Sequence, residues 1–210
     1  ICSPVTGSPV TFTAGAVTID LEVLGGAYDT VEVGSDAADA CRDDITSVAI
    51  INPASPAVTN LTIGEDAFRQ TVSGVTKLAA VTFPAGLDSL TVGDHAFAQQ
   101  SDPGDTSLSA VAFPAGLKNL TIGTGAFDQT ALHGGSDSLA SVTFPDGLET
   151  MSIASSAFHQ HAFGGTNALT SVSFPVGLTT LTIGDGAFYQ HAYGGSNTMT
   201  SVTFPNGLTQ

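Results

Sequence analysis

The chain repeats one pattern, L-x-x-V-x-F-P-x-G-L-x-x-L-T-I-G-x-x-A-F-x-Q, over most of its 210 residues. The copy at residues 78–99 reads LAAVTFPAGLDSLTVGDHAFAQ, and the copy at residues 169–190 reads LTSVSFPVGLTTLTIGDGAFYQ. The apolar residue that opens each unit recurs after 33, 30, 31, 30 and 30 residues, at Ile45, Leu78, Leu108, Leu139, Leu169 and Met199. A fixed period of this length is the signature of stacked repeats. We therefore expect five full units and a sixth that stops at Gln210, in a natural protein that continues further.

Each unit contains two stretches that alternate between apolar and polar residues. In the fifth unit, Val172 and Phe174 alternate with serines, which predicts a strand with one buried face. Pro175 ends this strand because proline cannot donate a hydrogen bond to a sheet. Residues 178–183 alternate in the same way and predict a second strand. A turn then brings Phe188 into the core, and the variable segment after it is expected to be a return loop.

One unit cannot fold alone, because ordering about thirty residues costs more entropy than burying about eight apolar side chains offsets. Each unit must therefore gain burial and hydrogen bonds from its neighbours, which is the property of a solenoid. The prediction is a β-rich solenoid, a right-handed array of coils with parallel strands, over residues 45–210. Residues 1–44 lie outside the repeat, and alternation at residues 17–23 and 31–33 predicts strands of an N-terminal β cap that covers the open end.

The repeated motifs L-x-x-V-x-F-P and G-L-x-x-L-T-I-G-x-x-A-F resemble those of the BspA-like leucine-rich-repeat family, from Ile45 to Gln210. This chain is an extended variant, because its units are longer than the family's usual ones. The resemblance implies a solenoid in a secreted or surface-attached protein, and several family members resemble adhesins. A glutamine stands near the position of the family's cysteine, at Gln70, Gln99, Gln129, Gln160 and Gln190.

Charge limits the partners of this chain. Four Lys and Arg residues stand against 19 Asp and Glu residues, for a net charge of −15. Such a surface repels nucleic acid and anionic membrane faces, so we expect no nucleic-acid binding. The apolar runs are too short for a transmembrane helix, so we expect no membrane insertion in this segment. Two cysteines precede the repeats, Cys2 and Cys41. In a secreted protein the simplest interpretation is a disulfide between them within the cap, and in a reducing compartment they would be buried thiols.

Three sets of recurring polar or aromatic residues are candidates for function. The glutamine column is interpreted as a structural ladder of side-chain amides, with a polar binding row as the alternative. Two hydroxyl rows run along the strand positions of Thr82, Thr143, Ser173 and Thr203 and of Thr62, Thr91, Thr121, Ser152 and Thr182. A regular threonine array can bind ice, although threonine is also an ordinary exposed strand residue. Asn60 and Asn119 each begin an N-x-T glycosylation motif.

The variable segments of units four and five carry rings at matching positions: His159, His161, Phe163, Tyr189, His191 and Tyr193. These rings either form a recognition patch or pack beneath the loops as additional core. Two histidines in register offer a metal only two ligands, so no metal site and no cofactor is predicted. No nucleophile elbow, phosphate loop or paired carboxylate stands out, so we expect no enzyme activity.

The combined prediction is a secreted or cell-surface scaffold that binds a protein or a glycan on a surface, or that self-associates, through the ring-bearing segments. One alternative is a structural subunit of an extracellular fibre, sheath or surface layer. A more distant alternative is ice binding through the threonine rows.

Overall fold

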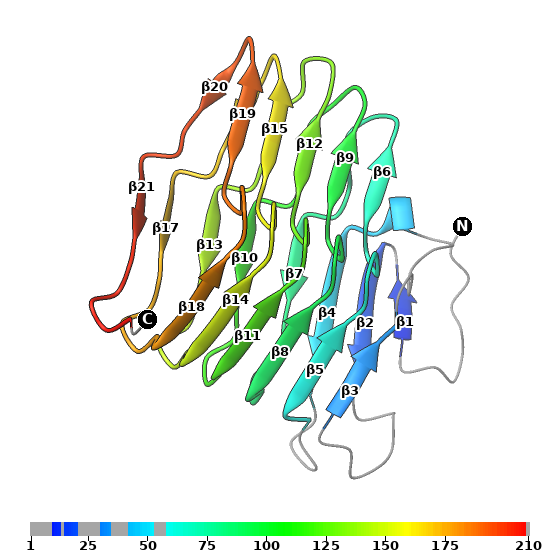
Figure 1. Cartoon of the computed structure of the whole chain (residues 1–210). Helices are drawn as coiled ribbons and strands as arrows, with labels where there is room; N and C mark the ends of the chain where they lie inside the picture. The colour runs from blue at the N-terminus through cyan, green and yellow to red at the C-terminus, as the bar shows by residue number, and fades with distance from the viewer. Residues whose placement is uncertain (1–9, 14, 21–29, 35–41, 53–57, 209–210) are drawn as a thin grey trace.

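The computed structural model describes residues 10–13, 15–20, 30–34, 42–52 and 58–208, and shows a β-solenoid of stacked coils. Each full coil contributes one strand to each of three sheets, so that neighbours in a sheet come from successive coils (Figure 1). The pairing between coils is parallel and in register. The predicted fold class is therefore confirmed.

The first sheet position holds the strand that precedes the Phe-Pro motif, together with the strands that pair in line with it nearer the N-terminus. These strands are β1 (Val10–Thr13), β2 (Ala16–Asp20), β4 (Ser47–Ile51), β7 (Ala80–Thr82), β10 (Ala110–Ala112), β13 (Ser141–Thr143), β17 (Ser171–Ser173) and β21 (Ser201–Thr203). Their hydrogen bonds form three groups, β1-β2-β4-β7, β10-β13 and β17-β21, and contacts join β7 to β10 and β13 to β17.

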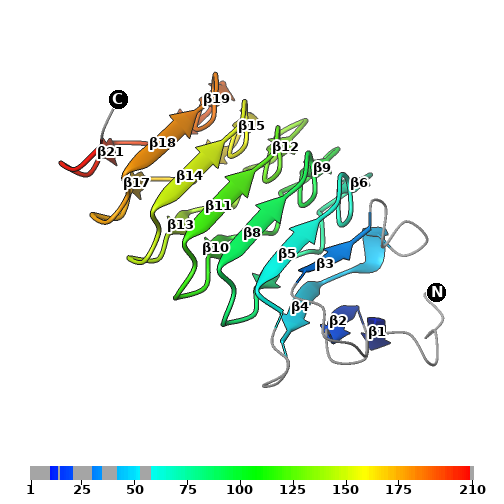
Figure 2. The same cartoon turned by 60° about the horizontal axis from the view of Figure 1, so that its bottom comes forward.

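The second position forms one continuous six-stranded sheet, which runs diagonally across Figure 2. Its strands are β3 (Thr30–Val33), β5 (Asn60–Ile63), β8 (Ser89–Val92), β11 (Asn119–Ile122), β14 (Thr150–Ile153) and β18 (Thr180–Ile183). The third position forms a five-stranded sheet of β6 (Gln70–Val72), β9 (Gln99–Ser101), β12 (Gln129–Ala131), β15 (Gln160–Phe163) and β19 (Gln190–Tyr193). Two short strands, β16 (Thr166–Asn167) and β20 (Ser196–Asn197), pair beyond it.

The sequence interpretation assigned the segments after the glutamines to return loops. This assignment was wrong, because each of these segments begins with a third strand. Residues 160–163 and 190–193 are strands, and only the Gly-Gly segments after them are turns. The inward positions of these strands hold glutamine and small residues instead of large apolar ones. Apolar alternation therefore could not reveal them, because their burial depends on hydrogen bonds to neighbouring coils.

The segment predicted to be a cap also forms strands. β2 pairs in parallel with β4, β3 pairs in parallel with β5, and β1 pairs antiparallel with β2. A short 3-10 helix, η1 (Arg42–Asp44), lies against β6. These elements cover the first repeat, while the division of the chain at residue 45 stays a prediction.

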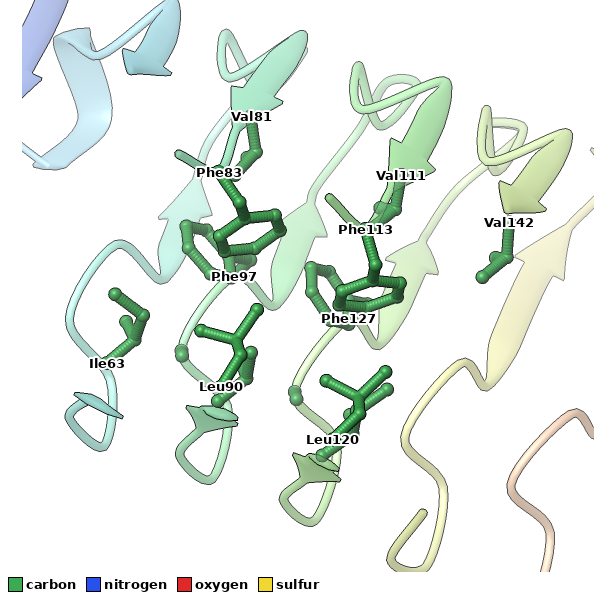
Figure 3. Packing of buried hydrophobic residues seen from close by; sticks show 14 of the residues in the cluster. Ile63, Val81, Phe83, Leu90, Phe97, Val111, Phe113, Leu120, Phe127 and Val142 are labelled. Carbon is green, nitrogen blue, oxygen red and sulfur yellow. The ribbon is translucent and has the colours of Figure 1, made fainter. Parts of the chain in front are cut away.

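Two columns of stacked phenylalanines fill the interior (Figure 3). One column stands at the A-F position, where Phe127 and Phe158 are fully buried and their ring centroids lie 5.2 Å apart. The other column belongs to the F-P motif, where Phe113 and Phe144 stack at 5.5 Å. The columns meet edge to face, as Phe113 does with Phe127 at 6.2 Å. Strands about 4.8 Å apart bring identical rings to this stacking distance, so each coil repeats the packing of the one before.

Candidate functional site: an aromatic ridge on the third sheet

The six rings predicted from the variable segments lie together on the outer face of β15 and β19. Along β15 the side chains of Gln160 and Ala162 are buried, so those of the alternating residues point outward. β19 pairs with β15 in register, His161 with His191 and Phe163 with Tyr193. His159 and Tyr189 continue the outward positions before each strand. We call the six residues 159, 161, 163, 189, 191 and 193 the aromatic ridge.

The ridge is a two-by-three array of rings. Across the two coils the ring centroids of His159 and Tyr189 lie 5.6 Å apart, those of His161 and His191 5.2 Å, and those of Phe163 and Tyr193 5.0 Å. Along each strand the neighbouring centroids lie 4.3–5.9 Å apart. Tyr189 is 53% exposed and Tyr193 is 54% exposed. The ridge is therefore a pre-formed surface that presents aromatic rings together with the hydroxyl groups of its tyrosines and the nitrogens of its imidazoles.

Its imidazoles are held in different environments. The Nδ1 atom of His159 lies 3.1 Å from Asp128 Oδ1, which orients that ring. Burial lowers the pKa of His161, and the neighbouring His159 and His191 lower it further. The Nε2 atom of His161 is buried and has no hydrogen-bond partner among the described residues. The lowered pKa keeps the His161 imidazole in its neutral form near pH 7.

The predicted glutamines lie inside the coils, directly beneath the third sheet. Gln129 Nε2 donates to Leu108 O at 2.7 Å, and Gln129 Oε1 accepts from Leu139 N at 2.7 Å. Gln129 Nε2 also lies 3.2 Å from Gln99 Oε1. Each glutamine thus joins the residue that opens its own unit to the residue that opens the next one. The same arrangement recurs at Gln70, Gln99, Gln160 and Gln190, and Gln70 Nε2 also donates to Arg42 O.

The second hydroxyl row lies on the outer face of the six-stranded sheet. Thr121 pairs in register with Thr91 and Ser152, and Thr182 continues the row. A second outward row includes both glycosylation motifs, in which Asn119 Oδ1 accepts from Thr150 Oγ1 at 2.7 Å. The first row, at Thr143 and its counterparts, lies on a different sheet.

Cys2 and Cys41 lie outside the described residues. Within the part of the chain that the structure describes, no three His, Cys, Asp or Glu side chains converge to hold a metal ion. No helix among the described residues is long and apolar enough to cross a membrane.

Sequence reasoning missed the neighbours of the ridge on the third coil. Leu132 follows Ala131, which pairs with Ala162, and so it stands opposite Phe163. Leu132, His133 and Phe163 line a hollow of about 280 Å³. The signal for Leu132 was available, because it occupies the repeat position of Phe163 one unit earlier.

Comparison with known protein families matches residues 49–210 to the BspA type leucine-rich repeat region, in six copies. The chain belongs to the BspA-type leucine-rich-repeat family. Proteins with such repeats are typically non-catalytic scaffolds that mediate protein interactions, and BspA-type members are typically surface-associated. No curated protein and no solved structure matches the chain. The BspA-type repeats therefore account for the scaffold of stacked coils.

Proposed function

We propose that this BspA-type protein is a non-catalytic scaffold at an extracellular or cell surface, and that it binds a protein or glycan through the aromatic ridge. The observation that carries the proposal is the exposure of Tyr189 and Tyr193 beside stacked imidazoles on one face of two coils. Aromatic side chains supply large contact areas and dominate binding hot spots. Positions that repeat in every coil serve the stack, whereas the ridge positions vary between coils and are free to encode specificity.

A charge argument supports the same surface. The chain carries a net charge of −15, which disfavours anionic partners over most of its surface. The outward side chains of the ridge are rings instead of carboxylates, and its central imidazole is neutral near pH 7. The ridge is therefore a place where a partner can bury apolar surface without desolvating several acidic groups.

The test is a double substitution, Tyr189→Ser with Tyr193→Ser, in otherwise unchanged protein. Labelled parent and variant would be applied to printed glycan and peptide arrays, and their self-association would be measured by sedimentation. We expect binding of the variant to the best array ligand to fall at least tenfold. A second pair, Thr143→Lys with Thr182→Lys, places the same number of changes on two other sheets and should bind like the parent.

One second candidate function has a specific observation in its favour. The in-register rows of the six-stranded sheet present hydroxyl and amide groups at strand spacing on a single face, the arrangement suited to a flat, ordered surface such as ice. If the threonine pair loses binding while the tyrosine pair retains it, the binding face lies on one of the two hydroxyl-bearing sheets and the ridge proposal is wrong. Thr182→Lys alone then tests the six-stranded sheet.

A further inference from the structure

The stack of rings in the ridge ends abruptly at the third coil. The ring of Phe163 stacks on Tyr193 with 5.0 Å between centroids and an angle of 16° between planes. Its opposite face is directed toward the third coil, where the matching residue is Leu132. The hollow of about 280 Å³ lined by Leu132, His133 and Phe163 occupies this side. The hollow thus has an aromatic ring face on one wall and an aliphatic side chain on another.

A carboxylate stands at the rim of this hollow. Asp102, on the second coil, places Oδ1 at 2.5 Å from Nδ1 of His133, and both side chains are well exposed. Asp105 Oδ1 accepts from Ser136 N at 2.7 Å, so a second carboxylate contacts the same loop. The chain as a whole has only four Lys and Arg residues against 19 Asp and Glu residues. The electrostatic potential around the hollow therefore favours a cation.

We propose that the hollow receives one planar cationic side chain, the guanidinium of an arginine on a basic partner protein. The inference rests on the proposed function and narrows its partner to a protein. A guanidinium is weakly hydrated and stacks on aromatic faces, and its fork of donors matches a carboxylate. In this arrangement the guanidinium lies on the free face of Phe163, its aliphatic stem packs on Leu132, and Asp102 accepts its hydrogen bonds.

Other ligand chemistries fit these residues less well. A lysine ammonium carries the same charge but is compact, strongly hydrated and without a plane to stack. A neutral ring, whether of a sugar or of an aromatic side chain, would stack but would gain nothing from Asp102. An anion would be repelled by the charge of the chain. Planarity and positive charge are therefore both required, and the two requirements can be tested separately.

The test uses three capped pentapeptides that differ only in the central residue of Gly-Gly-X-Gly-Gly: arginine, lysine and citrulline. Citrulline keeps the planar end group and removes its charge, whereas lysine keeps the charge and removes the plane. Each peptide would be titrated into the full chain at low salt while the ring protons of Phe163 are followed by nuclear magnetic resonance. We expect the arginine peptide to bind at least tenfold more tightly than either of the others.

Two variants locate the binding. Leu132→Phe fills the hollow with a ring that continues the stack, and we expect at least a tenfold loss of affinity for the arginine peptide although all six ridge rings remain. Asp102→Asn should weaken binding severalfold. Its matched control, Asp146→Asn, removes the same charge at an exposed turn outside the hollow and should leave the affinity unchanged.

The outcomes separate this inference from the proposed function. Equal affinity for arginine and citrulline, or unchanged arginine binding by Leu132→Phe, would overturn the arginine subsite. If Leu132→Phe also keeps parental binding on the arrays while the tyrosine pair loses it, the ridge stands and only the subsite fails. If the tyrosine pair binds the arrays like the parent while Leu132→Phe loses the arginine peptide, the subsite stands and the ridge fails.

Discussion

At the scale of single residues, a column of polar side chains shows how in-register pairing determines the hydrogen-bond partners of each side chain. Asp137, Asn167 and Asn197 occupy the same position in three successive coils. The amide Nδ2 of Asn167 donates to Asn197 Oδ1 at 2.7 Å. The buried Oδ1 atom of Asn167 has no partner among the described residues, and neither have the carboxylate oxygens of Asp137. A protonated Asp137 side chain can donate the hydrogen bond that Asn167 Oδ1 lacks.

Burial raises the pKa of Asp137 to about 8, and the nearby backbone of His161 and Ala131 offsets only part of that effect without making a hydrogen bond of good geometry to the carboxylate. The side chain is therefore neutral at pH 7. Its O–H group is placed by register to donate to Asn167, and the column then resembles an uninterrupted amide ladder.

This protonation makes stability depend on pH in a defined direction. The folded pKa of about 8 lies above the ordinary value of 3.8, so the stabilisation from the retained proton is complete below pH 3.8. It declines as the pH rises toward 8, by at most about 1.4 kcal/mol per pH unit, and then levels off. Asp137→Asn supplies an N–H donor at every pH. We expect the variant to gain stability relative to the parent between pH 4 and 8.

Urea unfolding of both proteins at pH 4, 6, 8 and 9 measures this gain, and Asp185→Asn, on an exposed turn, is the control. A difference in unfolding free energy that is the same at all four pH values would show that Asp137 does not hold its proton.

At the scale of elements, the third strand of each coil is the feature on which the candidate site depends. Its inward positions hold glutamine, which is buried in Gln70, Gln99, Gln129 and Gln160. Backbone groups of successive coils satisfy each amide, so the strand is held against the interior by hydrogen bonds more than by apolar contact. The outward positions are then free to carry the ridge, because the stack constrains only the inward ones.

Gln129→Met keeps the approximate volume of the side chain and removes the hydrogen bonds of its amide, including those to the backbone of Leu108 and Leu139. The carbonyl of Leu108 and the N–H of Leu139 would remain buried without a partner, at about 1–3 kcal/mol each, so we expect a loss of about 2–4 kcal/mol. Thr130→Ala changes the neighbouring outward residue and should cost less than about 0.5 kcal/mol. Denaturant titration compares the two. If Gln129→Met is as mild as Thr130→Ala, the glutamine column does not hold the third sheet.

At the scale of the whole molecule, stability comes from contact between neighbouring coils. Each complete coil contributes the same glutamine, and from the second unit on the same ring pair, and nearly every strand hydrogen bond joins two coils. An array of this kind is approximately a sum of unit and interface contributions. Coil number, more than any single contact, should then set the resistance to unfolding.

Deletion of residues 139–168 removes one complete unit and joins Ser138 to Leu169, which restores the pattern. We expect a folded, shorter solenoid with a lower melting temperature than the parent, measured by circular dichroism. Deletion of residues 139–153 removes the first two strands of a unit and joins Ser138 to the turn that precedes a third strand, so this chain should not fold cooperatively. Equal melting temperatures for parent and full-unit deletion would contradict a stability that depends on coil number.

Three features could be predicted from the sequence alone: the coil period, the first two strands of each unit and the interior position of the A-F phenylalanine. These features are local, because alternation, proline and glycine act within a few residues of where they stand. The turn of the fifth unit was predicted to bring Phe188 into the core, and at the same repeat position Phe127 and Phe158 are fully buried. The six rings of the ridge were also found from the sequence, since their repeat positions match.

The third strand, the stacking of the rings and the hollow beside Phe163 could not be predicted from the sequence, because they arise from contacts between coils. Glutamine is ordinarily a surface residue, and its burial here depends on backbone groups supplied by two different units. The rings stack because parallel pairing in register places equivalent residues about 4.8 Å apart, a distance that no single unit contains. The hollow exists because the side chain of Leu132 is smaller than the rings at the same position in the next two coils. This difference in size creates a hollow only when the three coils lie side by side.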